Sequence, residues 1–236
     1  YFVRFAGMQN MREGGYHMFG SCVALFQVDG EPMVRTDQPW DIARAKEISV
    51  FPDTAYAGLF AQDLGPMIRD RGYRRIAIDN WYVFPAREFM ALQEIAPDVE
   101  FIPSHVMSEV RRVKSESELE IMRRSAALAV EAVETSLDAV KVGADEYDVV
   151  LLCEETMRRG GDIELAGQSI SGCGPNTSTG SWVPSSTQSR PIEAGEWVMM
   201  DVCPRIDGYA GDISRHRVAG DIGDLDARLR KMYDVT

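Results

Sequence analysis

The stretch from Glu196 to Gly220 reads EWVMMDVCPRIDGYAGDISRHRVAG, and it predicts a β-hairpin. Its first arm, Trp197 to Cys203, is apolar, and its second arm alternates in polarity. Between the arms, Asp207-Gly208 is a strong signal for a tight hairpin turn. Because side chains alternate between the faces of a strand, such a turn places Asp201 and Asp212 on one face, directly opposite or one pair apart.

The two carboxylates predict a metal site. Neighbouring positions on paired strands lie roughly 5–8 Å apart, and two carboxylates at that distance repel unless a cation or a shared proton lies between them. Asp201 also follows the apolar run Trp197 to Met200, where an uncompensated carboxylate is costly. One or two metal ions are therefore expected here, with an ordinary acidic hairpin in a solvated sheet as the alternative.

Two segments resemble the pita-bread metallopeptidase family, which includes methionine aminopeptidase, aminopeptidase P, prolidase and the metal-free creatinase. The first is the strand rising into Asp201, the turn with Gly208-Tyr209, and the Asp-x-Ser-Arg sequence that begins at Asp212. The second is VRRVKSESELEIMRRSAALA, from Val110 to Ala129, which is similar to the Lys-Ser-x-x-Glu-Leu segment that opens the family's catalytic domain. The chain before that segment resembles the N-terminal domain of the creatinase and prolidase branch.

The resemblance implies a fold and a set of ligands. We expect an α/β N-terminal domain of creatinase type over residues 1–110, and the first half of an α+β pita-bread catalytic domain over residues 111–236. Asp201 and Asp212 match the family's two Asp ligands, which bind two divalent ions (Mn, Co, Zn or Fe) in the full-length protein. The family's other ligands, a His and two Glu, follow this hairpin. We therefore expect a partial chain that binds metal weakly or not at all by itself.

The expected activity follows from the same resemblance. The leading expectation is a metal-dependent hydrolase of a C–N bond, peptide or amide, that is Xaa-Pro peptidase-like, forms a homodimer and acts on a small peptide or a small amide. One alternative is a non-peptidase family member, either a small-molecule amidohydrolase, a creatinase-like amidinohydrolase or a lyase. Another is a catalytically inactive binding homologue.

One position departs from the family pattern. The family places a catalytic His in the loop before the hairpin, and the matching position, 17 residues before Asp201, holds Pro184. No His lies between His105 and His216, so the catalytic residues stay unassigned. Ser185, Ser186 and His216 are the candidate substrate-binding residues.

Composition limits the partners. The net charge of −12 and the lack of a basic tract argue against nucleic acid and anionic membranes. Four cysteines without CxxC spacing indicate free thiols in a reducing compartment. No run of 18 apolar residues and no signal-like start are present, so we expect a cytoplasmic protein.

Periodicity and caps predict the main elements. Residues 1–110 alternate between strands and helices, which is typical of an α/β domain. Ser115 and Glu118 form a capping box that predicts the start of a long helix, which we expect to end at Gly143. The further predictions are a helix at Asp145 to Arg159, a strand at Ile163 to Ser171, a polar loop at Cys173 to Arg190, and a helix from near Leu225.

Overall fold

The structure is a computed structural model that describes the chain apart from residues 1, 7–21, 162–168, 181 and 236. Its internal contacts divide the chain into two compact units, residues 1–113 and residues 114–236. The domain boundary expected after residue 110 lies close to this division, and its assignment as a domain boundary stays a prediction.

The first unit is an α/β unit whose elements alternate along the chain. Its strands and helices are β1 (Phe2–Ala6), β2 (Cys22–Phe26), β3 (Met33–Thr36), α1 (Ile42–Ile48), β4 (Asp53–Tyr56), α2 (Phe60–Asp70), β5 (Arg75–Asp79), α3 (Ala86–Ile95), β6 (Glu100–Ser104) and α4 (Val106–Arg112). The strands form one mixed sheet in the order β4-β3-β2-β1-β5-β6, with β1 antiparallel to β2 and parallel to β5.

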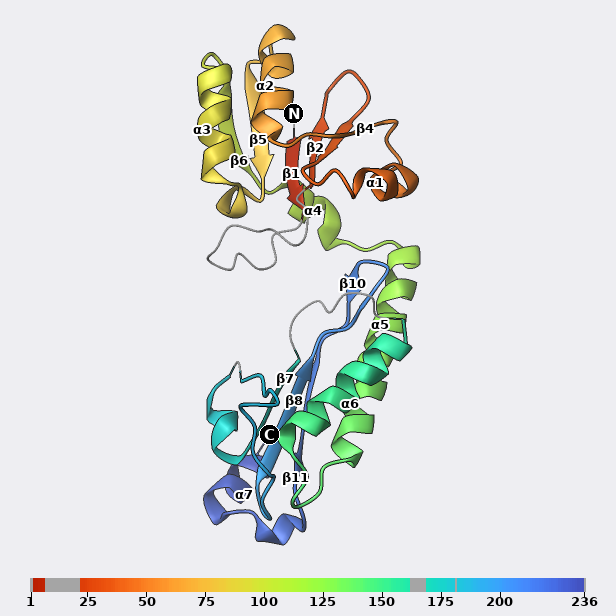
Figure 1. Cartoon of the computed structure of the whole chain (residues 1–236), viewed down its shortest axis with the longest axis vertical. Coiled ribbons are helices and arrows are strands. Elements are labelled where there is room, and N and C mark those ends of the chain that lie inside the picture. Colours follow the sequence, from red (N-terminus) through yellow and green to blue (C-terminus); the bar gives the residue numbers. More distant parts are fainter. Residues whose placement is uncertain (1, 7–21, 162–168, 181, 236) are drawn as a thin grey trace. The chain divides into compact units, whose positions relative to one another are not determined.

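The core of the first unit lies between this sheet and two helices. Ile76 and Ile78 of β5 are fully buried, together with Leu25 of β2. They pack in one cluster with Leu64 and Ile68 of α2. Figure 1 shows α2 and α3 side by side next to β5 and β6.

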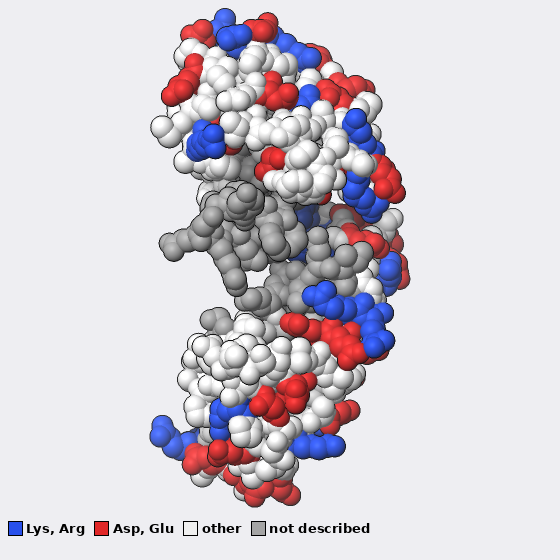
Figure 2. Space-filling view, viewed as in Figure 1, with Lys and Arg blue, Asp and Glu red and all other residues white. Residues whose placement is uncertain are grey.

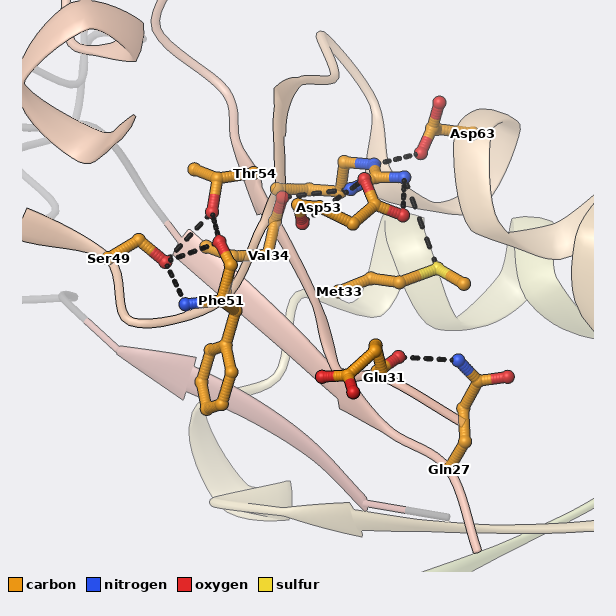
Figure 3. Close-up of polar contacts among 10 residues, drawn as sticks. Gln27, Glu31, Met33, Val34, Ser49, Phe51, Asp53, Thr54 and Asp63 are labelled. Carbon is orange, nitrogen blue, oxygen red and sulfur yellow. Dashed lines mark hydrogen bonds and ion pairs between the residues drawn. The ribbon is translucent and has the colours of Figure 1, made fainter. Parts of the chain in front are cut away.

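Ion pairs connect β3 to β4 and to α2. The guanidinium of Arg35, whose side chain is 11% exposed, lies 2.8 Å from Asp53 of β4 and 2.6 Å from Asp63 of α2 (Figure 3). Thr54 donates in turn to Ser49 and to the carbonyl of Phe51 at the end of the loop before β4. These contacts hold a short strand that has little apolar surface of its own.

The second unit carries the hairpin. Its elements are α5 (Glu116–Asp138), α6 (Glu146–Arg159), β7 (Ile170–Cys173), the 3₁₀ turn η2 (Gly174–Ser178), β8 (Trp197–Val202), β9 (Arg205–Ile206), β10 (Tyr209–Ala210), β11 (Ile213–Val218), the 3₁₀ turn η3 (Ile222–Asp224) and α7 (Ala227–Tyr233). The sheet order is β11-β8-β7, and both pairs of neighbours are antiparallel. Helices α5 and α6 lie along one face of this sheet (Figure 1).

Alternation along β8 separates a core face from an outer face. Val198, Met200 and Val202 are fully buried, and they pack against α5 and α6 through residues such as Val133 and Cys153. The residues between them, including Asp201, are only partly buried and lie on the opposite face. The outer face of this sheet therefore carries the carboxylates.

Several sequence expectations are corrected by the structure. The helix expected to run to Gly143 ends at Asp138. The expected polar loop from Cys173 begins with the final residue of β7 and the η2 turn. Most of the strand expected from Ile163 to Ser171 falls on residues 162–168, outside the described residues.

Charge and cysteine placement agree with the composition. On the face drawn in Figure 2, acidic and basic side chains are interspersed in both units. All four cysteines are free thiols. Among the described residues, no helix combines the length and the apolar character needed to cross a membrane.

Candidate metal centre

The register of β8 and β11 decides which side chains meet. Asp201 pairs directly with Ser214, and Val202 pairs with Ile213. Continued by one more pair, this register would place Cys203 opposite Asp212, so Asp212 lies two positions along the strand from Ser214, the direct partner of Asp201. Both carboxylates therefore lie on the outer face of the sheet, as the turn at Asp207-Gly208 predicts, and their role as metal ligands stays a prediction.

Four polar side chains form what we call the hairpin cluster: Asp201, Cys203, Asp212 and Ser214. Ser214 Oγ donates a hydrogen bond of 2.8 Å to Asp201 Oδ1. Burial, together with the nearby carboxylates of Asp212 and Asp201, raises the pKa of the Cys203 thiol to about 11. The thiol is therefore protonated at neutral pH and is close to both acids.

The tip of the hairpin is attached to the start of α5. Tyr209 Oη donates to Glu118 Oε1 at 2.7 Å, and Arg124 lies 3.3 Å from Asp207. Glu118 also accepts from the backbone N–H and the hydroxyl of Ser115, which completes the predicted capping box. The hydrogen bond from the Ser115 backbone and the one from Tyr209 lower the pKa of Glu118 to about 2.

A second attachment lies next to Asp212. Ser125 Oγ of α5 donates to the carbonyl of Pro204 at 3.0 Å, and Gly211 N donates to the same carbonyl at 2.9 Å. Gly211 passes so close to α5 that an added Cβ would lie 2.6 Å from the Ser125 carbonyl oxygen. Only glycine permits this approach, which fixes the backbone immediately before Asp212.

The loop before the hairpin is organised by a buried acid. Glu146, the first residue of α6, is 0% exposed. Its carboxylate accepts from Cys173 N at 3.0 Å, Asn176 Nδ2 at 2.7 Å and Trp182 Nε1 at 3.1 Å. Sequence reasoning missed this residue, because a Glu in the first turn of a helix is usually a solvated partner of the helix dipole.

The other predicted site residues are dispersed. Pro184 is buried, Ser185 is partly buried, and Ser186 is exposed. Ser185 and Gln188 exchange backbone hydrogen bonds of 3.0 Å, so they close a small turn. His216 shares the face of the hairpin cluster, and its ring packs against Trp197 with centroids 4.9 Å apart and the ring planes tilted by 57°. Burial, followed by the nearby Arg215, lowers the pKa of His216.

The donor set fits part of a metal site. Two carboxylates on one face suit a divalent cation, and the hydrogen bond from Ser214 resembles the outer contacts that orient ligands. Among the described residues, however, no group of three or more His, Cys, Asp or Glu side chains is placed to hold a metal ion. The pair therefore fits two positions of a coordination shell that needs further ligands.

Comparisons with known proteins include a family match that covers the hairpin. Residues 120–236 match metallopeptidase family M24. An uncharacterized peptidase of Bacillus subtilis is 24% identical over 191 residues, which is 80% of this chain and 52% of that protein. An Xaa-Pro dipeptidase of Pyrococcus furiosus is 25% identical over 130 residues, 55% of this chain and 36% of that protein. The chain thus spans about a third to a half of these relatives.

Solved structures show the same fold over almost the whole chain. An X-Pro aminopeptidase of Thermotoga maritima has a TM-score of 0.78 at 19% identity, with 99% of this chain and 64% of that one covered. A prolidase of Pyrococcus furiosus has a TM-score of 0.76 at 20% identity, covering 99% of this chain and 65% of that one. The fold is a creatinase-type α/β unit followed by part of a pita-bread unit, as expected from the hairpin.

Proposed function

Because residues 120–236 belong to metallopeptidase family M24, we propose that the whole protein is a metal-dependent hydrolase of a C–N bond, peptide or amide. The observation that carries the proposal is the placement of Asp201 and Asp212 on one face of β8 and β11. The peptidase names of the relatives in Bacillus subtilis and Pyrococcus furiosus support the hydrolase class.

In this proposal Asp201 and Asp212 hold two divalent ions (Mn, Co, Zn or Fe), together with a His and two Glu that the family places after the hairpin. When bound, such ions supply a water molecule of lowered pKa and polarise the substrate carbonyl. Ser214 keeps the Asp201 carboxylate oriented through its hydrogen bond. Gly211, pressed against α5, fixes the backbone that carries Asp212.

The substrate class follows from Pro184. In the peptidases that the chain resembles, a His at this position donates a hydrogen bond as charge develops on the substrate. Proline has neither a side-chain donor nor a backbone N–H, so Pro184 cannot replace that donor. Loss of one such donor costs on the order of 10²–10³ in rate. We therefore assign a small polar amide, rather than an Xaa-Pro dipeptide, as the preferred substrate.

The presence of Pro184 at the expected His position also supports a second candidate function. Pro184 together with the Asp201 and Asp212 pair favours a metal-using family member that is not a peptidase, such as a small-molecule amidohydrolase or a lyase. Ser185, Ser186 and His216 are proposed substrate contacts in either case. We further propose that the protein is cytoplasmic and forms a homodimer, and light scattering of the purified protein tests the dimer.

The deciding experiment is a side-by-side assay of the metal-loaded whole protein. Ala-Pro is compared with creatine and with a panel of small amides, each measured with Mn²⁺ and with a chelator. Chelator-sensitive turnover of an amide above that of Ala-Pro supports the hydrolase. Elimination without hydrolysis supports a lyase, and metal binding without any turnover supports an inactive binding homologue.

A further inference from the structure

The most unusual buried group outside the hairpin cluster is the carboxylate of Glu146. It is fully buried, and its hydrogen bonds come from neutral donors in three places along the chain: the end of β7, the η2 turn, and Trp182. A carboxylate is expensive to bury unless its oxygens are well supplied with donors. Its position at the N-terminus of α6 adds a favourable dipole.

These contacts fix the segment that carries the proposed substrate residues. We use the name site loop for residues 174–190, of which residue 181 lies outside the described residues. Trp182 is held through both its side chain and its backbone. Its indole N–H donates to Glu146, and its carbonyl accepts from Ser171 N at 3.1 Å. Pro184 and Ser185 follow within three residues.

The sheet places this segment beside the hairpin cluster. Ile170 of β7 pairs with Asp201 of β8, and Ser171 is the next residue along β7. The bond from Ser171 N to the Trp182 carbonyl places the site loop at the free edge of β7. Since neighbouring strands lie roughly 4.8 Å apart, the Trp182 backbone is about 10 Å from that of β8. A shift of the loop would therefore change one side of the proposed substrate site.

The end of the site loop is attached independently. Ser189 Oγ donates to Asp145, the N-cap of α6, and Ile192 N donates to the carbonyl of Ala144 at 2.8 Å. These contacts do not involve the Glu146 carboxylate, and the Glu146 backbone N–H, which any side chain leaves in place, donates to the Arg190 carbonyl at 3.1 Å. Loss of the Glu146 carboxylate should therefore release the first part of the loop while its end stays attached.

We propose that Glu146 is a positioning residue, which sets the place of Pro184 and Ser185 at the β7 side of the sheet by holding Trp182, Asn176 and the Cys173 amide. The inference rests on the proposed function, since it assigns the site loop to the substrate site. Glu146 does not touch substrate; it acts through the loop. The conformation of the site loop is thus determined by Glu146 at the start of α6, on the core side of the sheet.

Hydrogen exchange of the purified protein tests the positioning directly. Glu146→Gln replaces one acceptor oxygen with an amide that faces donors, so exchange at Cys173 to Thr179 and at Trp182 should rise by roughly 10- to 100-fold. Exchange in β8 and α5 should stay unchanged. Glu134→Gln, the same chemical change at an exposed site on α5, is the matched control. A uniform rise across the second unit would mean a purely structural role and would overturn the proposal.

A rescue and a kinetic measurement complete the test. In Glu146→Gln with Asn176→Asp, the amide and the carboxylate exchange places, and slow exchange of the loop should return in part. For a probe of the substrate panel that is turned over, Glu146→Gln should raise KM by about tenfold and leave Mn²⁺ affinity unchanged. An unchanged KM with lower kcat, as expected for a smaller folded fraction, counts against the proposal. If no probe is turned over, the proposed function fails, and hydrogen exchange still decides the role of Glu146.

Discussion

Ser214 and Asp201 are direct partners across β8 and β11, and the Ser214 hydroxyl donates to Asp201 Oδ1 at 2.8 Å. The bond occupies one oxygen of the carboxylate and leaves the other available. Asp201 is thereby oriented by the sheet itself, before any ion is added, and Asp212 lies directly before β11, two residues from Ser214.

Metal affinity should fall most when Asp201 or Asp212 is replaced and less when Ser214 is replaced. Asp201→Asn and Asp212→Asn each remove a charged ligand, so Mn²⁺ binding to the whole protein should fall below detection in calorimetry. Ser214→Ala removes only the orienting bond and should weaken binding roughly tenfold. Asp207→Asn, at the exposed hairpin tip, is the control and should bind normally. Normal binding by both ligand variants would exclude the proposed site.

Gly211→Ala should disturb both stability and metal binding. The added Cβ would lie 2.6 Å from the Ser125 carbonyl oxygen, a backbone atom of α5 that cannot move freely. Overpacking of this kind costs about 1–3 kcal/mol in the free energy of unfolding. Gly180→Ala is the matched control, because nothing lies within 4 Å of its Cβ position. Equal unfolding midpoints for the two variants in urea would contradict the close contact.

The Glu118 contacts should stabilise the fold in a defined pH range. Because the folded-state pKa of Glu118 is lowered from 4.5 to about 2, its contribution is complete above pH 4.5 and is lost as pH falls toward 2. Glu118→Gln should therefore lower the melting temperature at pH 7 and have little effect near pH 2. Tyr209→Phe should reproduce part of the difference. A difference between wild type and Glu118→Gln that is constant with pH would disprove the assignment.

Buried thiols should resist alkylation in the folded protein. Burial raises the pKa of Cys153 to about 11 and that of Cys173 to about 12, the latter with a contribution from Glu146. Since the thiolate is the reactive form, iodoacetamide near neutral pH should leave both unlabelled, as read by mass spectrometry. Both should react once the chain is unfolded in guanidinium. Rapid labelling of Cys173 in the folded protein would show that its surroundings are more open than the structure indicates.

Replacing Pro184 should alter peptidase activity. The wild-type protein should turn over Ala-Pro more slowly than roughly 10 per second, the low end for dedicated enzymes. Pro184→His supplies a donor and should raise that rate, by up to roughly 10²-fold, with a new ionisation near pH 6.5. Thr187→His places the same side chain at an exposed position of the loop that is not a proposed substrate contact, and it should have no effect. A wild-type rate typical of prolidases would refute the substrate assignment.

Capping residues and turn residues predicted the helices and the hairpin in which they lie. The capping box of Ser115 and Glu118 gave the start of α5, and the cap at Asp145 gave that of α6. The common face of Asp201 and Asp212 followed from the turn at Asp207-Gly208, whose residues both have positive φ, while the sequence left the exact register open. In each case the sequence determines the backbone within a few residues, so no distant contact is needed to predict it.

Other features could not be predicted from the sequence, because they depend on contacts between distant residues or show no apolar periodicity. Helix α1 has no buried residue, so no apolar stripe marks it. Strand β6 contains Pro103, which argues against a strand, yet β6 lies at the edge of the sheet where a missing N–H is tolerated. The partners of Glu146 come from residues 27 to 36 positions later, and no local pattern reveals them.

The attachment of the hairpin tip to α5 also has a consequence for register. A slip of β11 by one residue against β8 would exchange its two faces and turn Asp212 toward the apolar side that carries Met200. Tyr209 on Glu118 and Gly211 on Ser125 both oppose such a slip, because each contact exists in only one alignment. Helix α5 thus fixes the alignment of β11 against β8. Mutations on this helix, which contains no proposed ligand, can therefore turn the Asp212 carboxylate away from Asp201.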